Sequence, residues 1–362
     1  MTGPLPRGAT IGMLGGGQLG RLMAVAASRL GYHVAVLDPD PACPAAEVAS
    51  HHIVAAYDDA DALDRLAGEV ALVTYEFENV PVSAARRLAA RVPVRPGARA
   101  LEVAQDRVTE KTFLNGIGIA TARFAAVDSG ADAARALGSF AGGGVLKTRR
   151  FGYDGKGQIV LAPGGDAEAG FAAIGRQPAI LEERIGFDCE ISVVAARGLD
   201  GAVAAYEPAR NEHAGGILRR STVPAGVSTK VAEEARRIAG RILEALDYVG
   251  VIGVEFFVAG DRLLVNEIAP RVHNSGHWTE AACHVSQFEL HMRAVCGLPL
   301  GGTTRHSDCV MENLIGDEIG RIAALAADDA VVVADYGKAE TRPGRKMGHF
   351  TRLTGRAAPA RG

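Results

Sequence analysis

The sequence predicts an α/β protein with more than one domain, and three observations lead to this conclusion. In the N-terminal part, short apolar segments alternate with amphipathic ones, which is typical of a doubly wound parallel sheet. Farther along, two apolar segments flank Gly260 and Asp261, a pair that favours an antiparallel hairpin. The chain has 362 residues, more than a single hydrophobic core usually organises.

The N-terminal elements follow a strand-helix-strand order. Apolar runs at Ala9–Leu14 and His33–Leu37 predict strands, and Leu19–Leu30 between them predicts a helix. A further strand is expected at Val70–Thr74. Because strands joined in this way by helices form parallel sheets, we expect residues 1–105 to be a Rossmann-like domain.

The rest of the chain predicts a smaller and a larger domain. Helices are expected at Asp106–Ala120 and Lys230–Leu246. Shorter apolar segments predict strands at Thr121–Val127, Gly144–Lys147, Gln158–Leu161, Ala179–Glu182, Glu190–Ala196 and Val331–Ala334. We expect residues 106–180 to form a small lid domain. Residues 181–362 should form a large domain that includes a C-terminal substrate-binding segment.

Composition argues against several classes of protein. The formal net charge is −3, so charge gives no reason to expect a nucleic-acid partner. The five cysteines are scattered without a C-x-x-C pair, which favours reduced, buried thiols over disulfides or a zinc site. We find neither a secretory leader nor an apolar run long enough to span a membrane, so we expect no membrane partner and a cytoplasmic location.

A glycine-rich motif, Gly15–Gly20, follows the first predicted strand and opens the first helix. Asp38 stands at the end of the second strand, which completes the pattern of a dinucleotide-binding fingerprint. Such glycines let a phosphate approach a helix N-terminus. We favour a phosphate cradle for a nucleotide-like substrate. An NAD site and a tight turn without a ligand are the alternatives.

A second glycine-rich segment, Gly152–Gly157, follows Lys147 at the end of a predicted strand. A lysine beside a flexible loop can clamp a polyphosphate and close over it as a lid. The segment lacks the P-loop pattern, and a plain surface hairpin is the alternative.

A cluster of carboxylates lies in and after the strand predicted at Ala179–Glu182. The backbone of such a strand can contact adenine, and a carboxylate such as Glu183 or Glu190 can bind ribose hydroxyls. The alternative is a cluster of ordinary surface carboxylates.

Two glutamates lie within the predicted hairpin of Val251–Val258 and Leu263–Ile268. Glu255 and Glu267 fall at roughly facing positions, and two carboxylates in apolar surroundings need a cation to remain ionised. Magnesium is the cation that we expect, since it prefers oxygen ligands. The alternative is a salt bridge to a neighbour such as Arg271.

Two polar segments complete the pattern. Pro270–Thr279 directly follows the second hairpin strand and is too polar for a core, so we interpret it as an anion-binding or substrate-binding loop. Lys338 and the segment Arg342–Lys346 are basic, and the glycine and proline among them favour a fixed loop that holds a phosphate. A solvated basic face is the alternative for the latter.

Taken in order, these segments resemble the ATP-grasp superfamily and, within it, the N5-carboxyaminoimidazole ribonucleotide synthetase family, the ATPase subunit of phosphoribosylaminoimidazole carboxylase. The matching motifs are Gly15–Arg21, Thr74–Asn79, Gly152–Gln158, Asn266–Trp278 and Arg342–Lys346. Asn266–Trp278 is the most specific, because most other ATP-grasp families lack it. The resemblance implies an ATP-grasp fold with a Rossmann-like pre-ATP-grasp domain, a small lid and a C-terminal domain.

The resemblance also implies a reaction. ATP phosphorylates bicarbonate to carboxyphosphate, and the amine of 5-aminoimidazole ribonucleotide then captures the carboxyl group, a step of de novo purine biosynthesis. ATP and Mg²⁺ are the implied cofactors, and a homodimer is the implied assembly. Carboxyphosphate concentrates negative charge, so cations must surround it, and a dry, lidded site would protect it from water.

The family's functional residues transfer to this sequence as follows. The implied nucleotide-binding residues are Arg107, Lys147, Gly152, Tyr153, Asp154, Gly155, Lys156, Gly157, Gln158, Glu182, Glu183, Ile185, Glu190, His213, Asn266 and Glu267. The implied residues for the aminoimidazole ribonucleotide are Gln18, Leu19, Glu76, Tyr153, Asp154, Lys338 and Arg345. Glu255 and Glu267 are the implied magnesium ligands. The implied catalytic residues are Arg271, His273 and Asn274 near bicarbonate, with Asp154 and Lys338.

Three other functions stay open at this stage. A formate-dependent glycinamide ribonucleotide transformylase would share ATP and a ribonucleotide substrate. An NAD-dependent oxidoreductase would rest on Gly15–Gly20. A nucleotide-binding regulator would bind ATP without turnover. The family pattern usually continues with a helix after Gly348–Phe350, so we expect either a shortened member or an abnormally ended reading frame, with Ala357–Gly362 disordered.

Overall fold

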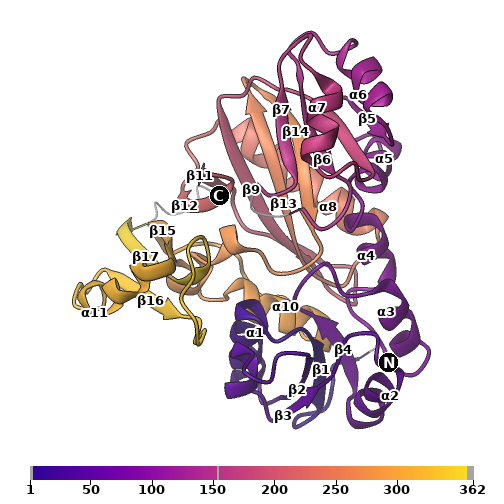
Figure 1. The fold of residues 1–362 in the computed structure, drawn as a ribbon. Coiled ribbons are helices and arrows are strands. Elements are labelled where there is room, and N and C mark those ends of the chain that lie inside the picture. The colour runs from indigo at the N-terminus through magenta and orange to yellow at the C-terminus, as the bar shows by residue number, and fades with distance from the viewer. Residues whose placement is uncertain (1–2, 153–154, 357–362) are drawn as a thin grey trace.

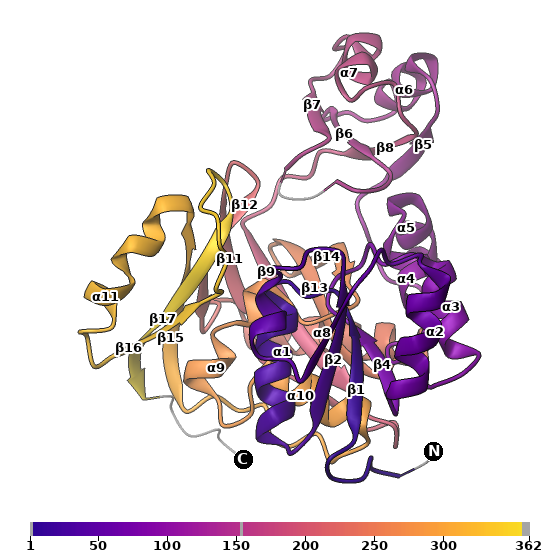
Figure 2. The same cartoon turned by 60° about the horizontal axis from the view of Figure 1, so that its bottom comes forward.

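The computed structural model describes residues 3–152 and 155–356, and the described chain contains three separate β-sheets. Figures 1 and 2 show a parallel sheet at the N-terminus, a small sheet that stands apart at one end, and a large sheet between and beside them. Residues 153–154 and the tail at 357–362, for which disorder is predicted, lie outside the described residues.

The N-terminal sheet is entirely parallel, with the strand order β3-β2-β1-β4. Its strands are β1 (Thr10–Leu14), β2 (His33–Asp38), β3 (His51–Val54) and β4 (Leu72–Tyr75). The accompanying helices are α1 (Gln18–Arg29), the short 3-10 helix η1 (Pro44–Glu47), α2 (Ala60–Glu69), α3 (Val82–Ala89) and α4 (Ala98–Ala104). β1, β2 and β4 are almost fully buried, as expected for parallel strands covered on both faces. The predicted parallel sheet is confirmed.

The small sheet is antiparallel, with the strand order β5-β8-β6-β7, and is called the lid sheet because it lies in the region for which a lid is predicted. Its strands are β5 (Phe124–Val127), β6 (Gly144–Thr148), β7 (Gln158–Leu161) and β8 (Ala179–Glu183). Helices α6 (Gly130–Leu137) and α7 (Ala167–Ala173) pack on it around a core that includes Leu146 and Phe171. This separate core lets the lid sheet hold together as one unit.

Helix α5 (Arg107–Gly116) leads from the N-terminal region to the lid and packs beside β14. Asp106 caps it by accepting hydrogen bonds from the backbone N–H groups of Val108 and Thr109, at 3.0 and 3.1 Å. The predicted helix was longer, because its apolar periodicity continues to Ala120. In the structure Gly118 adopts a φ of +72°, which breaks the helical path before β5.

The large sheet has nine strands, in the order β14-β13-β9-β11-β12-β15-β17-β16 with β10 on the side of β9. Its strands are β9 (Cys189–Arg197), β10 (Val203–Ala205), β11 (Ala209–Ala214), β12 (Ile217–Val223), β13 (Gly250–Ala259), β14 (Arg262–Ala269), β15 (Ser307–Ile315), β16 (Val331–Asp335) and β17 (Lys346–Arg356). Its helices are α8 (Thr229–Ala245), η2 (Asn274–Gly276), α9 (Thr279–Ala282), α10 (Gln287–Cys296), η3 (Gly316–Arg321) and α11 (Ile322–Leu325). The predicted hairpin is confirmed as β13 and β14.

Helix α10 joins the N-terminal region to the large sheet. It packs against α1 on one side and against β9 and β13 on the other, and Phe288, Leu290 and Met292 are fully buried in the shared core. A helix held on both sides is a rigid support for whatever its first turn contacts.

Two predictions about the chain as a whole can be compared with the fold. All five cysteines are unpaired and buried, which confirms the predicted free thiols. Within residues 3–152 and 155–356, we find no helix with the length and apolar character needed to cross a bilayer.

Candidate active site

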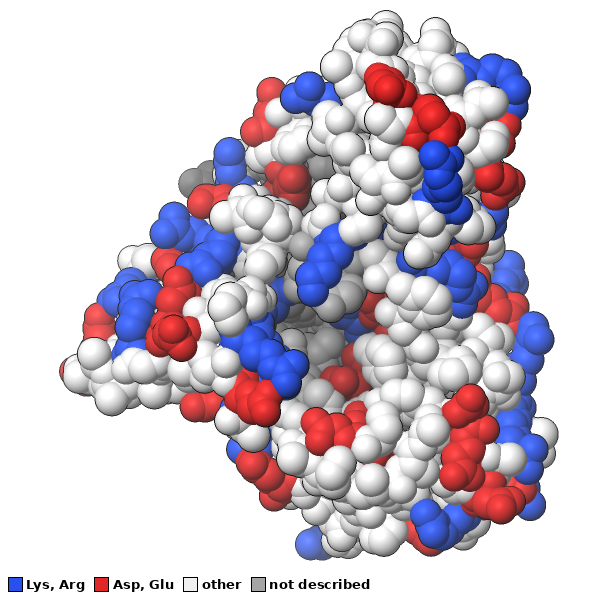
Figure 3. All heavy atoms as spheres, in the orientation of Figure 1, with Lys and Arg blue, Asp and Glu red and all other residues white. Residues whose placement is uncertain are grey.

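A cleft of about 600 Å³ opens where the three sheets approach one another. Figure 3 shows this hollow, with Lys and Arg side chains at its edge and acidic side chains next to them. Seventeen of the residues assigned by resemblance line it. They are Gln18, Leu19, Glu76, Arg107, Lys147, Gly152, Gly155, Lys156, Gln158, Glu190, His213, Glu255, Asn266, Glu267, Arg271, His273 and Asn274.

Several assigned residues lie away from the cleft lining. Glu182 is buried beneath it and pairs with Lys147 at 2.9 Å, whereas Glu183 pairs with Arg123 at 2.7 Å. Gly157 and Ile185 are also absent from the lining. Tyr153 and Asp154 lie outside the described residues.

The two basic residues assigned near the C-terminus also lie outside the lining. Lys338 donates to the backbone carbonyl of Lys346 at 2.6 Å, and Lys346 itself lines the cleft. Arg345 donates to the carbonyl of Glu340 at 2.8 Å. The basic segment therefore reaches the cleft through Lys346, a residue that the resemblance did not assign.

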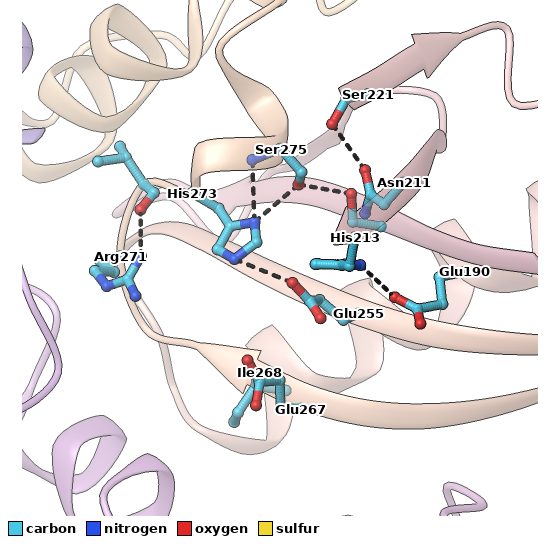
Figure 4. A network of polar contacts seen from close by, with 12 residues as sticks. Glu190, Asn211, His213, Ser221, Glu255, Glu267, Ile268, Arg271, His273 and Ser275 are labelled. Carbon is cyan, nitrogen blue, oxygen red and sulfur yellow. Dashed lines mark hydrogen bonds and ion pairs between the residues drawn. The ribbon is translucent and has the colours of Figure 1, made fainter. Parts of the chain in front are cut away.

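The two hairpin glutamates face each other directly. Glu255 on β13 pairs in register with Glu267 on β14, which confirms the predicted juxtaposition. Figure 4 shows Glu255 between His273 and His213. The Nε2 atom of His273 lies 3.4 Å from Glu255, and Arg107 contacts Glu267 at 3.0 Å. Arg271, the alternative partner considered from the sequence, instead bonds Glu78.

The surroundings of the two carboxylates push their pKa values apart. Burial, with the charge of Glu267, raises the pKa of Glu255 to about 7. Burial also acts on Glu267, but Arg107 and Lys147 outweigh it and lower the pKa of that carboxyl. The pair thus holds one negative charge firmly and the second weakly, so a divalent cation would stabilise the fully ionised pair.

These residues fit magnesium. Glu255, Glu267 and the side-chain oxygen of Asn266 are hard oxygen donors, and that Asn266 oxygen is buried with no hydrogen-bond partner in the described part of the chain. Among the described residues, no group of three or more His, Cys, Asp or Glu side chains could hold a metal alone. This agrees with the way Mg²⁺ binds, through one or two carboxylates and the phosphates of a nucleotide.

The nucleotide end of the cleft combines charged and aromatic groups. His213 contacts Glu190 at 2.7 Å. Burial alone would lower the pKa of this imidazole, but Glu190 together with the charges of Glu255 and Glu267 raises it. Phe187 stacks on Phe257 with ring centroids 4.7 Å apart, and both rings line the cleft. A flat apolar surface beside hydrogen-bonding groups suits a purine base.

The sequence analysis missed buried charges on α5 beneath this end. Lys111 donates to the carbonyl of Asn266 and lies 3.7 Å from Glu182. Glu110 accepts a hydrogen bond from the N–H of Ile268 at 2.6 Å, and burial raises the pKa of its carboxyl to about 7. Adjacent charges at the centre of a predicted helix were the only signal for this support, and that pattern usually indicates a solvated face.

The base of the second glycine-rich segment is fastened to the start of α5. Arg149 makes a bidentate contact with Asp106, with bonds of 2.9 and 3.0 Å. Arg107 donates to the carbonyl of Gly152 at 3.2 Å as well as to Glu267. One guanidinium thus connects the lid segment with a predicted metal ligand.

The backbone N–H groups of the first glycine-rich segment already bond carboxylate side chains of the protein. The N–H of Gly16 donates to Asp38 at 2.7 Å, and the N–H groups of Gly17 and Gly20 donate to Glu76 at 2.9 Å each. These three donors, which the phosphate-cradle prediction would use, therefore bond carboxylates of the chain itself. Gln18 and Leu19, the next residues of the motif, line the cleft.

The polar loop after β14 brings Arg271, His273 and Asn274 to one wall of the cleft. The Nδ1 atom of His273 faces Ser275, with its hydroxyl at 2.8 Å and its N–H at 3.4 Å. Both side-chain polar atoms of Asn274 are buried, and neither has a hydrogen-bond partner among the described residues. Since buried polar groups are normally bonded, this amide fits a ligand that both donates and accepts.

Comparisons with known proteins cover nearly the whole chain. The family model for the ribonucleotide synthetase preATP-grasp domain matches residues 8–105, and that for the ATP-grasp domain matches residues 112–288. The model for the phosphoribosylaminoimidazole carboxylase C-terminal domain matches residues 309–361. These matches confirm the predicted ATP-grasp fold and its pre-ATP-grasp domain.

Individual proteins are similar over the same length. The N5-carboxyaminoimidazole ribonucleotide synthase of Brucella melitensis is 57% identical over 352 residues, which cover 96% of this chain and 97% of that protein. The structure of the N5-carboxyaminoimidazole ribonucleotide synthetase from Thermus thermophilus has a TM-score of 0.89 at 47% identity, covering 95% of this chain and 93% of that one. A structure from Aspergillus clavatus, in complex with ADP and 5-aminoimidazole ribonucleotide, has a TM-score of 0.89 at 28% identity, covering 96% and 94%.

Proposed function

We propose that this chain, which belongs to the N5-carboxyaminoimidazole ribonucleotide synthase family, uses ATP and bicarbonate to carboxylate 5-aminoimidazole ribonucleotide. The observation that carries this proposal is the convergence of three groups in one cleft. These are the paired carboxylates of Glu255 and Glu267, the cations Arg107 and Lys147, and the buried amide of Asn274.

In this reaction an oxygen of bicarbonate attacks the γ-phosphorus of ATP, and ADP leaves. The amine nitrogen of the ribonucleotide then bonds the carboxyl carbon of carboxyphosphate, phosphate leaves, and the nitrogen loses a proton. Arg107 and Lys147 bind the phosphates, while Glu255 and Glu267 hold magnesium. When bound, the magnesium ion neutralises phosphate charge. Such preorganised cations favour the charged transition state.

Arg271, His273 and Asn274 bind bicarbonate in this proposal. Bicarbonate carries one hydroxyl donor and several acceptor oxygens, so it satisfies both polar atoms of the Asn274 amide. Formate has acceptors only and would leave the amide oxygen without a donor. This favours bicarbonate over the formate-dependent transformylase.

The first glycine-rich segment argues against the oxidoreductase alternative. In dinucleotide-binding proteins, the acidic residue after the second strand accepts from a ribose hydroxyl. Asp38 instead accepts from the N–H of Gly16 and from the hydroxyl of Tyr57, at 2.7 and 2.6 Å. The Asp38 carboxylate is therefore occupied by hydrogen bonds within the protein. We propose that Glu76 and Gln18, which line the cleft, contact the aminoimidazole ribonucleotide instead.

The test is phosphate release from ATP, measured with each substrate omitted in turn. We expect release to require both aminoimidazole ribonucleotide and bicarbonate. Equal release with glycinamide ribonucleotide and formate would contradict the proposal. ATP binding without any turnover would identify a regulator instead.

A homodimer in the cytoplasm is also part of this proposal. Closed two-fold dimers are the commonest oligomers, and five free, buried thiols suit a reducing compartment. Light scattering at micromolar concentration should give twice the chain mass of 37.6 kDa, and a monomer mass would contradict the dimer.

A further inference from the structure

A buried glutamine holds the loop that carries Arg271, His273 and Asn274 from behind. Gln287 is the first residue of α10, and none of its side chain reaches solvent. Its amide oxygen accepts from the N–H of His273 at 2.8 Å, and its amide nitrogen donates to the carbonyl of the same residue at 2.7 Å. The nitrogen also lies 3.0 Å from Nδ1 of His277.

The orientation of the Gln287 amide follows from the chemistry of its partners. A backbone N–H can only donate and a carbonyl can only accept, so the oxygen must face the N–H of His273 and the nitrogen its carbonyl. Rotating the amide by half a turn would break both bonds. The same nitrogen then donates to Nδ1 of His277, which places the proton of that imidazole on Nε2. Gln287 thereby fixes both the backbone of His273 and the tautomer of His277.

A second residue fastens the far end of the loop. The hydroxyl of Thr279 donates to the carbonyl of Gly276 at 2.6 Å and accepts from the N–H of Gln287 at 3.0 Å. A Cβ atom at Gly276 would lie 2.8 Å from the Gln287 oxygen and 2.8 Å from Val194, so only glycine allows this approach. Thr279 is fully buried, like Gln287.

We propose that Gln287 and Thr279 are positioning residues, which hold the loop at the geometry that the bicarbonate site requires. The inference rests on the proposed function, because it assumes that His273 and Asn274 bind bicarbonate. Neither Gln287 nor Thr279 lines the cleft, so both act through the loop. The glutamine projects from a helix packed on both sides, which makes it a fixed reference for the loop.

The position of the clamp determines which kinetic constant it controls. Its bonds end on the backbone of His273, whose imidazole faces Glu255 on one wall of the cleft. The nucleotide-binding groups Lys147 and Glu190 lie on β6 and β9, and the hydrogen bonds of the Gln287 and Thr279 side chains end on other residues. Loss of the clamp should therefore raise the KM for bicarbonate and leave the KM for ATP nearly unchanged.

The main test is Gln287→Met, which retains side-chain length and removes all three hydrogen bonds. A displacement of a bound substrate by about 1 Å can reduce rates up to about a hundredfold, so we expect the KM for bicarbonate to rise on the order of tenfold. The KM for ATP should stay within about twofold. Gln287→Glu retains the acceptor for the His273 N–H but loses both donations, and we expect it to raise the bicarbonate KM as well.

Thr279 supplies a matched pair if the glutamine variants fail to fold. Thr279→Val removes the hydroxyl at nearly constant volume, and Thr279→Ser restores it. We expect the valine variant to raise the KM for bicarbonate and the serine variant to return it toward the starting value. Tyr32→Phe is the stability control, because it removes a buried hydroxyl that donates to the carbonyl of Leu5 at 3.2 Å in the N-terminal region. It should leave every KM unchanged.

The outcomes separate the clamp from the proposed function. An unchanged bicarbonate KM in Gln287→Met and Thr279→Val, with a bicarbonate-dependent parent enzyme, would overturn the positioning role alone. Equal increases in the KM for ATP and bicarbonate would also overturn it, since they indicate general loosening. A parent enzyme that turns over without bicarbonate would overturn both the clamp and the proposed function.

Discussion

The two glycine-rich segments look alike in the sequence but are glycine-rich for different physical reasons. In the first segment, a Cβ atom at Gly16 would lie 2.3 Å from the sulfur of Cys43, and one at Gly17 would lie 2.5 Å from Glu76. In the second, a Cβ at Gly152 would meet nothing closer than 3.2 Å, and Gly155 adopts a φ of +76°. Gly16 and Gly17 therefore need glycine for space, whereas Gly155 needs it for backbone conformation. Gly15 and Gly157 combine both demands, with φ of +96° and +70° and Cβ positions 2.4 Å from Glu76 and 2.7 Å from Thr148.

The difference shows that a glycine motif does not by itself identify a mobile phosphate loop. The first segment packs tightly, and its N–H groups bond Asp38 and Glu76. The second is fastened at its base to Arg107, which also contacts Glu267. Variants that act on one segment and spare the other can test this contrast.

The largest effect is expected where the second segment meets the metal ligands. Glu267→Gln keeps the volume of the side chain but removes one anionic ligand and the charge opposite Arg107. We expect turnover to fall on the order of a hundredfold or more, as for other single electrostatic groups. Phosphate release across a magnesium titration measures it, with thermal melting to verify the fold. Near-normal turnover at low magnesium would mean that the metal binds elsewhere.

A buried imidazole joins the domain that carries the first segment to the large sheet. This contact predicts how the stability of the protein changes as pH falls. Nε2 of His291 lies 2.8 Å from the hydroxyl of Thr74, and Nδ1 accepts from the N–H of Val251 at 3.1 Å. Burial lowers the pKa of His291 to about 3. Below its unfolded pKa of about 6.5, the unfolded chain binds a proton that the folded chain excludes, so stability is lost as pH falls.

From this one group we expect the free energy of unfolding to fall by about 2 kcal/mol between pH 7.5 and 5. Urea unfolding at several pH values measures the slope. In His291→Gln the fall in the free energy of unfolding over the same pH range should be smaller by that amount, because glutamine does not titrate. Identical slopes would show that His291 becomes protonated in the folded protein.

A comparison of two alanine variants addresses the contrast between the segments directly. Gly17→Ala places a methyl group against the Glu76 carboxylate, and such overpacking typically destabilises by about 1–3 kcal/mol. Gly152→Ala would bring its methyl group to 3.2 Å from the Lys156 carbonyl and the Thr148 hydroxyl, which is a milder crowding, so we expect a smaller loss of stability than in Gly17→Ala. Urea unfolding measures the free energy of unfolding of both variants. Equal losses of stability would contradict the difference in packing between the two segments.

The smallest effect concerns closure of the second segment. We predict that the amides of Gly155 and Gly157 exchange hydrogen more slowly when ATP and aminoimidazole ribonucleotide bind, because closure orders a glycine-rich chain. Asp154, which lies outside the described residues, is predicted from the resemblance to contact the ribonucleotide. In Asp154→Asn the ratio of phosphate released to carboxylated product should rise. Equal exchange in both states, with an unchanged ratio, would indicate a static turn.

Much of the fold was predictable because local patterns determine it. Apolar runs predicted most of the parallel strands, and the position of the hairpin turn at Gly260 and Asp261 predicted that Glu255 roughly faces Glu267. β11 and β12 were among the strands missed, since consecutive Arg, Asn, Glu and His in β11 and the adjacent arginines of β12 hide their strand character. The domain boundaries at residues 105 and 180 stay predictions, although β8 crosses the second of them within the lid sheet.

The supporting shell of the site could not be predicted, because its partners are distant in sequence. Lys111 and Glu182 are buried together, and each alone looks like a surface charge. Gln287 gave no signal, since a glutamine at the start of an amphipathic helix is usually exposed. The sequence showed Asp38 as the acid of the dinucleotide fingerprint and Glu76 as part of a family motif. It could not show that both carboxylates bond the first glycine-rich segment, because these bonds form only in the tertiary structure.

The Glu76 carboxylate, which the N–H groups of Gly17 and Gly20 hold in place, also affects the orientation in which each ligand binds. Two phosphate-bearing molecules must share one cleft, each in its own orientation. Glu76, held by the first segment, lines the cleft from the N-terminal domain, whereas Lys147 lines it from β6 of the lid sheet. Two backbone N–H bonds keep Glu76 from turning aside. A nucleoside triphosphate that entered backwards would place its charge against this held carboxylate, which disfavours that orientation and leaves the Glu76 side free for the acceptor amine.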